Sequence, residues 1–374
     1  MNISDRPQEP QRSAGRHLAL RGPPAAAAVV LLAVLASACA SHVTSPLAAA
    51  PATAHPATTA AAKPDPSGPA PAAGAAPAAT AYVVNSGSGT VTPINTATNT
   101  PGKPVRVGRQ PGVIAITPDG KTAYVANYGS GTVTPIRTAT NTAGKPVRVG
   151  LYPGQIAITP DGKTAYVASN GQANLPGSAG VTPIRTATSK AGKPIRVGGP
   201  ADCIAITPDG KTAYVGTGPV GTVVPIRTAT NKAGRGIPVA GGALVIAITP
   251  DGKTAYAAGD FSTKMTPIRT ATGKAGKPIR AGRDLDTIVI TPDGKTAYVD
   301  SFRGTVIPIR TATNTAGKAI RAGEGGALAV TPDGNTVYVA SYGPGTVTPI
   351  RTATNKAGKP VKVGRHPAAI AITR

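Results

Sequence analysis

The sequence predicts an all-β fold: a seven-bladed β-propeller of four-stranded antiparallel blades. Two repeated motifs and the lack of a helical pattern support this prediction. The motif Thr-Pro-Asp-Gly recurs with its proline at positions 118, 160, 208, 250, 292 and 332. The segment Pro-Ile-Arg/Asn-Thr-Ala-Thr recurs with its proline at positions 93, 135, 183, 225, 267, 308 and 349. Periods of this length are typical of propellers and solenoids, and the apolar residues follow no helical periodicity.

Each repeat predicts four short strands, as its second copy illustrates. Residues 114–117 are apolar and β-prone, and the turn that follows contains Asp-Gly, a pair that readily adopts the positive φ of hairpin turns. The second, third and fourth strands are expected over residues 122–126, 132–138 and 145–149. Because the third strand contains a proline, which has no amide hydrogen, we expect a bulge or a lost ladder bond there.

The two ends of the repeated region complement each other. The first repeat begins at its second strand, residues 81–84, and an unaccompanied first strand follows the last repeat at residues 370–373. Pairing of these N- and C-terminal strands would complete one blade and close the ring, which leaves few exposed sheet edges. An open solenoid would instead need dissimilar caps. We therefore expect a closed seven-bladed propeller over residues 80–374.

The composition excludes several classes of protein. Charged residues make up 14% and aromatic residues 3% of the chain, which is too few for a coiled coil or an ordinary helical enzyme. The 46 glycines and 39 prolines bring the composition close to that of low-complexity sequences. A chain of this composition can still form a folded domain because its apolar residues and its turns recur at regular positions.

The N-terminal segment indicates export. An arginine-rich stretch precedes residues 25–38, which carry no charge but are too short to span a bilayer. This pattern is typical of a secretory signal peptide, here residues 1–38. The residues before Cys39 resemble a lipobox, so we expect lipidation of Cys39 and a lipoprotein at the outer face of the cytoplasmic membrane or in the cell wall. Ala-Ser-Ala at 36–38 also suits ordinary signal peptidase, and a released, secreted protein is the alternative.

Residues 39–79 predict a disordered tether. They consist mainly of alanine, proline and threonine, with almost no bulky side chain. Such a segment buries too little apolar area to offset the entropy of ordering. Its threonine and proline content would also suit O-glycosylation, although we favour a plain linker.

Three segments of the repeat carry a family resemblance. They are Ile-Thr-Pro-Asp-Gly-Lys-Thr-Ala-Tyr-Val at 158–167, Ser-Gly-Thr-Val at 130–133 and Thr-Ala-Thr-Asn-Thr at 138–142. The repeat resembles the YVTN-type β-propeller family of microbial surface-layer and exported proteins, over residues 80–374. The resemblance implies a fold but no single activity, because propellers host unrelated functions.

One departure from the family pattern adds positive charge. Where the family usually has aspartate after the isoleucine of the third strand, this chain has arginine in six repeats and Asn95 in the first. The six are Arg137, Arg185, Arg227, Arg269, Arg310 and Arg351.

Strand direction sorts the charges between two faces. In a meander, the first-to-second and third-to-fourth turns share one face, which here is uniformly basic. The second-to-third turns and the loops between blades share the other, where the repeats differ from one another. The candidate binding residues of this variable face are Tyr128, Tyr152, Asp202, Asp284, Asp286, Phe302, Glu324, Tyr342 and His366. Loops on a rigid scaffold often carry recognition, although unconstrained drift of turn sequences would produce the same variation.

Little catalytic chemistry is indicated. His366 is the only histidine after residue 79, which excludes histidine-rich metal centres. Asp284, Asp286 and Glu324 are oxygen ligands of the kind calcium takes, but they lack the spacing of a known calcium loop, so we assign no metal, no cofactor and no catalytic residue. Cys203 stands where other repeats have small or medium-sized residues, which favours a packing role.

The leading functional hypothesis is a non-catalytic, lipid-anchored propeller that binds a protein or glycan partner at the cell envelope. A hydrolase or lactonase with a loop-carboxylate site is the enzymatic alternative. A wall-associated structural protein that binds anionic envelope polymers or phospholipid surfaces through the basic face is the third. Nucleic acid is not an expected partner, because the net charge of +24 is spread evenly without interleaved aromatic residues.

Overall fold

The computed structural model describes residues 80–95, 100–172, 175, 177–218, 220–259, 262–301, 303–323, 326–341, 344 and 346–362. The expected signal peptide, Cys39, the tether and the expected strand at 370–373 lie outside these residues. Within them the regular secondary structure consists of antiparallel strands and one short 3-10 turn, η1 (Tyr128–Ser130), with no α-helix. None of the described segments forms a helix that could cross a membrane.

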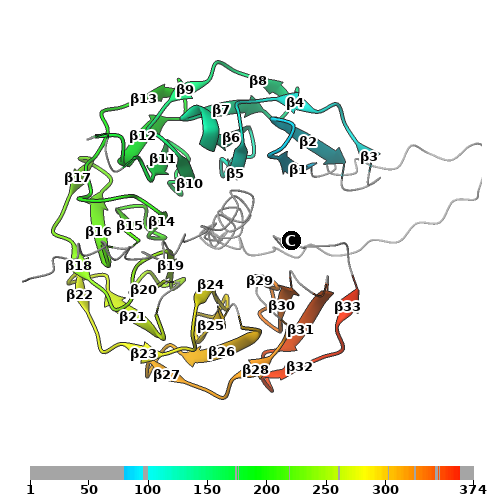
Figure 1. Ribbon diagram of the computed structural model, residues 1–374, viewed down its shortest axis with the longest axis vertical. Coiled ribbons are helices and arrows are strands. Elements are labelled where there is room, and N and C mark those ends of the chain that lie inside the picture. Colours follow the sequence, from blue (N-terminus) through cyan, green and yellow to red (C-terminus); the bar gives the residue numbers. More distant parts are fainter. Residues whose placement is uncertain are drawn as a thin grey trace, which may run out of the picture.

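The described strands form seven separate sheets set around a common centre (Figure 1). The innermost strands are β5 (Pro111–Ile116), β10 (Pro153–Ile158), β14 (Cys203–Ile206), β19 (Val245–Ile248), β24 (Leu285–Ile290) and β29 (Gly326–Val330). The second strands are β1 (Thr80–Asn85), β6 (Thr122–Asn127), β11 (Thr164–Ser169), β15 (Thr212–Gly216), β20 (Thr254–Ala258), β25 (Thr296–Ser301) and β30 (Thr336–Ser341). The third strands are β2 (Thr90–Asn95), β7 (Thr132–Arg137), β12 (Gly180–Arg185), β16 (Thr222–Arg227), β21 (Lys264–Arg269), β26 (Thr305–Arg310) and β31 (Thr346–Arg351).

In six of the seven sheets the outermost strand is broken into two short pieces that both pair with the third strand; in the third sheet the second piece is a single bridge between Val181 and Ile195. The first pieces are β3 (Thr100–Pro101), β8 (Thr142–Ala143), β13 (Lys190–Ala191), β17 (Lys232–Ala233), β22 (Lys274–Ala275), β27 (Thr315–Ala316) and β32 (Lys356–Ala357). The second pieces are β4 (Val105–Arg106), β9 (Val147–Arg148), β18 (Ile237–Pro238), β23 (Ile279–Arg280), β28 (Ile320–Arg321) and β33 (Val361–Lys362). The expectation of one continuous fourth strand was therefore wrong.

The proline of the third strand explains the break. In the second sheet, β6 and β7 pair in unbroken register, with Tyr124 opposite Pro135, so the third strand has no bulge. The carbonyl of Pro135 accepts a hydrogen bond from the amide of Gly144, 2.7 Å away on the outer side. Since a strand residue directs its N–H and C=O to the same side, the missing donor of Pro135 also faces outward. The ladder is therefore lost only between the third strand and the outermost one.

The hydrogen bonds of the turns confirm the two faces. The amide of Thr138, after the third strand, donates to the carbonyl of Lys121 in the Asp-Gly turn at 3.1 Å, and its hydroxyl donates to Gly120 O at 2.6 Å. On the opposite face, the amide of Tyr128 donates to the carbonyl of Gln110 at 3.0 Å, which joins a second-to-third turn to an interblade loop.

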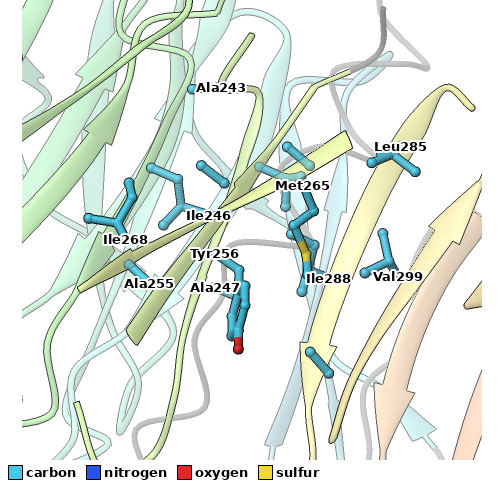
Figure 2. Packing of buried hydrophobic residues seen from close by; sticks show 14 of the residues in the cluster. Ala243, Ile246, Ala247, Ala255, Tyr256, Met265, Ile268, Leu285, Ile288 and Val299 are labelled. Atoms are coloured by element: carbon cyan, nitrogen blue, oxygen red, sulfur yellow. The ribbon is translucent and has the colours of Figure 1, made fainter. Parts of the chain in front are cut away.

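Apolar packing lies between sheets as well as within them. One cluster contains Ile246, Tyr256 and Met265 from one sheet and Leu285 and Ile288 from the next, all essentially inaccessible to solvent (Figure 2). Removing such side chains from water is the main source of stability in a protein of this kind. Each blade therefore depends on its neighbours for its core.

The tyrosines of six second strands, from β1 to β25, also reach the next sheet. The Tyr166 hydroxyl donates to Asn231 Oδ1 at 2.7 Å and to the carbonyl of Thr228 at 3.2 Å, in the third-to-fourth turn of the following blade. Asn231 has φ +53°, in the left-handed region that asparagine tolerates better than most residues. The same 2.7 Å tyrosine–asparagine contact joins Tyr82 to Asn141, Tyr256 to Asn314 and Tyr298 to Asn355. Gly273 stands at this turn position in the fifth sheet, and there Tyr214 contacts only the carbonyl of Thr270, at 3.2 Å.

Candidate functional site

The variable face contains a stacked aromatic pair. Tyr128, in η1, and Tyr152, in the loop before β10, have ring centroids 4.8 Å apart and an interplanar angle of 29°. Burial raises the pKa of Tyr128, and the nearby Tyr152 and Asp202 raise it further. The Tyr128 hydroxyl is therefore protonated at neutral pH and can donate a hydrogen bond.

The backbone at Tyr152 is strained. Its φ is +54°, in the left-handed region, and the equivalent residues Gln110 and Asp284 in other interblade loops have φ of +49° and +55°. The loop geometry thus requires this conformation, and a bulky residue adopts it at a cost of about 1–2 kcal/mol. Tyr152 thus places an aromatic side chain on a backbone conformation that favours glycine or asparagine.

Asp202 lies next to this pair and is held by an amide. The Asn170 side chain donates from Nδ2 to Asp202 Oδ1 at 2.6 Å. Asp202 precedes β14, and Asn170 follows β11, so the contact joins two neighbouring blades. Tyr128, Tyr152, Asn170 and Asp202 together form what we call the tyrosine patch, which spans three successive sheets. The sequence identified three of its members but not Asn170, whose only signal was its place in a second-to-third loop.

The remaining described candidates behave differently from one another. Asp284 accepts a hydrogen bond from Arg303 Nε at 2.9 Å, in an ion pair whose side chains are 42% and 68% exposed. Asp286 is only 2% exposed and lies within β24 rather than in a loop, and Asp300, in the adjacent β25, is fully buried. Cys203, read as a packing residue, is 1% exposed in β14.

Phe302, Glu324, Tyr342 and His366 lie outside the described residues. Among the residues that the structure does describe, no three His, Cys, Asp or Glu side chains are grouped to hold a metal ion. The trio of acids considered for calcium includes Glu324 and so falls partly outside the described part.

A second feature of this face was not anticipated from the sequence. A groove of about 430 Å³ lies between the first two sheets, lined by residues 86–89, 106–110 and 130. Arg109 is fixed at its edge, because its amide donates to Ser130 Oγ at 2.7 Å and its guanidinium donates to the carbonyl of Gly129 at 3.1 Å. The available signal was Arg109's position in an interblade loop.

Comparison with known proteins agrees with this architecture. Residues 46–176 match the model of a YNCE-like β-propeller family. The chain is a β-propeller protein. This match and the propeller neighbours below confirm the resemblance to YVTN-type propellers that the repeats predicted. No curated protein matches the sequence.

Several solved structures share this propeller's fold. Hydrazine synthase from Kuenenia stuttgartiensis is 25% identical, with a TM-score of 0.58 over 73% of this chain and 92% of that one. A protein of unknown function from Desulfotomaculum acetoxidans is 19% identical, with a TM-score of 0.61 over 78% and 98% of the two chains. A candidate 6-phosphogluconolactonase from Bacteroides fragilis is 18% identical, with a TM-score of 0.57 over 75% and 92%. The names of the first and third neighbours denote different activities on one scaffold.

Proposed function

We propose that this propeller is an exported, non-catalytic binding scaffold that holds a protein or glycan partner at the cell envelope through its variable face. The observation that carries the proposal is the tyrosine patch. Stacked tyrosines offer a large contact area at low cost in side-chain entropy, and the adjacent amide and carboxylate offer polar specificity. The strained φ of Tyr152 adds support, because backbone strain accumulates at functional sites.

Attachment to the envelope is the second part of the proposal. The signal peptide over residues 1–38 and the lipobox-like sequence before Cys39 support an N-terminal lipid, with residues 39–79 as the tether. Replacement of Cys39 by serine should move the protein from the membrane fraction to the soluble exported fraction. Mass spectrometry of the mature N-terminus should show an acylated cysteine in the native protein. An unmodified N-terminus would support the released, secreted form instead.

Closure of the seven sheets into a ring is the third part. Tyrosines of six successive second strands bond to the third-to-fourth turn of the following sheet. In a closed ring, Tyr338 of the last sheet faces the turn after β2, where Asn99 occupies the position equivalent to Asn231. A double-mutant cycle of Tyr338→Phe and Asn99→Gly should give a coupling free energy of about 1 kcal/mol. A coupling near zero would contradict closure.

Capture of the partner tests the binding proposal. The full chain, and a variant with Tyr128→Ser and Tyr152→Gly, would be cross-linked to native envelope, and the captured material identified and then purified. The purified partner should bind the native chain and lose at least tenfold in affinity for the variant. A control with Lys121→Gln and Lys163→Gln, on the opposite face, should bind normally. Equal affinity of all three proteins would reject the tyrosine patch as the binding site.

The enzymatic alternative rests on loop carboxylates, of which Asp286 is buried in β24, and on the name of one structural neighbour. The B. fragilis neighbour is 18% identical, which establishes only a shared fold. We therefore favour the scaffold over a hydrolase or lactonase.

A further inference from the structure

The basic face contains a groove where two blades meet. It lies between the sheets of β7 and β12 and has a volume of about 640 Å³. Its lining includes Arg137 at the end of β7, Lys145 between β8 and β9, and Lys190 at the start of β13 in the next blade. Thr188 and Ser189 add hydroxyl groups, and no aromatic side chain lines the groove.

The three cations of this groove are not neutralised by the described part of the protein. Each is exposed, and none forms an ion pair with a residue that the structure describes. The lysines of the Asp-Gly turns differ in this respect, because each lies 3.6–3.8 Å from the aspartate of its own turn. The groove therefore concentrates positive charge that is open to an external anion.

Like charges also face each other across the ladder beside the groove. Arg185 pairs with Lys190 in the register of β12 and β13. The same arginine–lysine opposition occurs in three further sheets, at Arg227 and Lys232, Arg269 and Lys274, and Arg351 and Lys356. Like charges placed directly opposite each other on neighbouring strands are destabilising. An anion bound between the two cations would relieve this repulsion, so the four arginine–lysine pairs favour a surface that binds anions.

The strand contacts and the basic residues of this groove recur at other blade junctions around the rim. The second outer piece of one sheet contacts the first outer piece of the next, as β9 does β13, β18 does β22 and β28 does β32. Residues equivalent to Arg137, Lys145 and Lys190 are basic at three further junctions. These sets are Arg185, Lys193 and Lys232; Arg227, Arg235 and Lys274; and Arg310, Lys318 and Lys356. A linear ligand with regularly spaced charges can thus pass from one groove to the next.

The chemistry of the lining favours phosphate. Arginine offers a planar fork of donors that matches phosphate oxygens, lysine adds a point charge, and hydroxyl groups of Thr188 and Ser189 can donate further hydrogen bonds. Proteins that bind single-stranded nucleic acid stack the bases on aromatic side chains, which this lining lacks. We propose that the interblade grooves of the basic face bind a linear phosphate polymer without bases. This site is separate from the tyrosine patch and does not depend on the proposed function.

A pair of charge-matched variants of the full chain tests the proposal. The groove variant replaces five arginines with glutamine: Arg137, Arg185, Arg227 and Arg310 of the four basic junctions, and Arg269, which holds the same position at the junction where Thr315 replaces the lysine. The control replaces the five lysines of the Asp-Gly turns with glutamine: Lys121, Lys163, Lys211, Lys253 and Lys295. Each loses five positive charges from exposed positions on the same face. Binding of inorganic polyphosphate would be followed by fluorescence anisotropy over a range of salt concentrations, with unfolding midpoints to verify folding.

We expect the groove variant to bind polyphosphate at least tenfold more weakly and the control to bind within about threefold of the native chain. The salt dependence should also weaken only in the groove variant, because each phosphate contact on a single strand contributes about 0.7 to the slope of log K against log salt. A third variant with lysine at the five arginine positions should retain part of the affinity, since it keeps the charge but loses the fork.

Three results would overturn the proposal. Equal losses in the groove variant and the control would show that net charge alone attracts the polymer. Equal affinity for polyglutamate would show that the grooves do not select phosphate. Tighter binding of a single-stranded oligonucleotide than of polyphosphate would assign the surface to nucleic acid.

Discussion

The tyrosine–asparagine contacts between blades predict that one blade junction can be strengthened by a single substitution. Gly273 occupies the turn position where four other sheets have an asparagine that accepts the tyrosine hydroxyl. Its φ is +61°, close to the +51° to +54° of Asn141, Asn231, Asn314 and Asn355. A Cβ added at Gly273 would meet nothing nearer than Ile237 Cδ1 at 3.8 Å, an ordinary contact. Asparagine should therefore fit there without moving its neighbours.

The expected gain follows from three contributions. A new hydrogen bond from Tyr214 to the introduced amide oxygen should add about 1 kcal/mol to the free energy of unfolding. Replacement of glycine also stiffens the unfolded chain, which stabilises the fold by about 0.4–1 kcal/mol where φ is compatible. Alanine gains the same stiffening but has no acceptor, and its left-handed φ costs about 1–2 kcal/mol. We expect Gly273→Asn to be about 1.5 kcal/mol more stable than Gly273→Ala.

The assay is a thermodynamic cycle with Tyr214→Phe. Unfolding of the four combinations of Gly273→Asn and Tyr214→Phe would be followed in denaturant, with Gly273→Ala as the steric control. The two substitutions should couple by about 1 kcal/mol, because the benefit of asparagine requires the hydroxyl. If Gly273→Asn stabilises the Tyr214→Phe protein just as much, backbone preference explains the gain and the contact contributes nothing.

Four further outcomes follow from the structure. The Thr159 hydroxyl and the amide of Lys163 donate hydrogen bonds to Asp161 and lower its pKa. Unfolding midpoints should therefore fall as the pH drops below about 4, and Thr159→Val should weaken this pH dependence. Burial raises the pKa of Tyr256 to about 12, so the free energy of unfolding should decline as the pH rises from about 10 towards 12. In a pH titration of the folded protein, the tyrosinate absorbance of Tyr256 should appear at higher pH than that of an exposed tyrosine. Tyr152→Gly should leave the free energy of unfolding within about 1 kcal/mol, because relief of strain offsets the lost stacking, as calorimetry can measure. Met265→Ala should cost about 2–5 kcal/mol in denaturant unfolding because Met265 is fully buried between two sheets.

The repeat made most of the fold predictable. The first three strands of the second copy lie within three residues of their expected bounds, at β5, β6 and β7. Asp-Gly turns depend on local backbone preferences, and the sharing of faces follows from strand direction alone. The break in the outermost strand was not predicted, because the sequence does not show whether the backbone of Pro135 faces the second strand or the outermost strand.

The candidate site was less predictable because its contacts join different blades. The sequence placed Tyr128, Tyr152 and Asp202 on one face but did not indicate that the two rings stack or that Asn170 holds Asp202. Those contacts depend on how each sheet is rotated against the next, which no local pattern records. Asp286 was placed in a loop, but β24 begins one residue earlier and buries it.

The interrupted outermost strand has a consequence for the behaviour of the protein at high concentration. A continuous strand at the rim of each blade would offer a row of unpaired amides and carbonyls on which another chain could assemble. Here that rim consists of two-residue pieces separated by a glycine and a basic residue, and a proline follows in most blades. Such an edge is too short and too charged to template a foreign strand. The third-strand proline, Pro135 in the second sheet, costs the blade part of its ladder, and the interrupted edge that results helps a chain with many copies of one strand to avoid edge-to-edge aggregation.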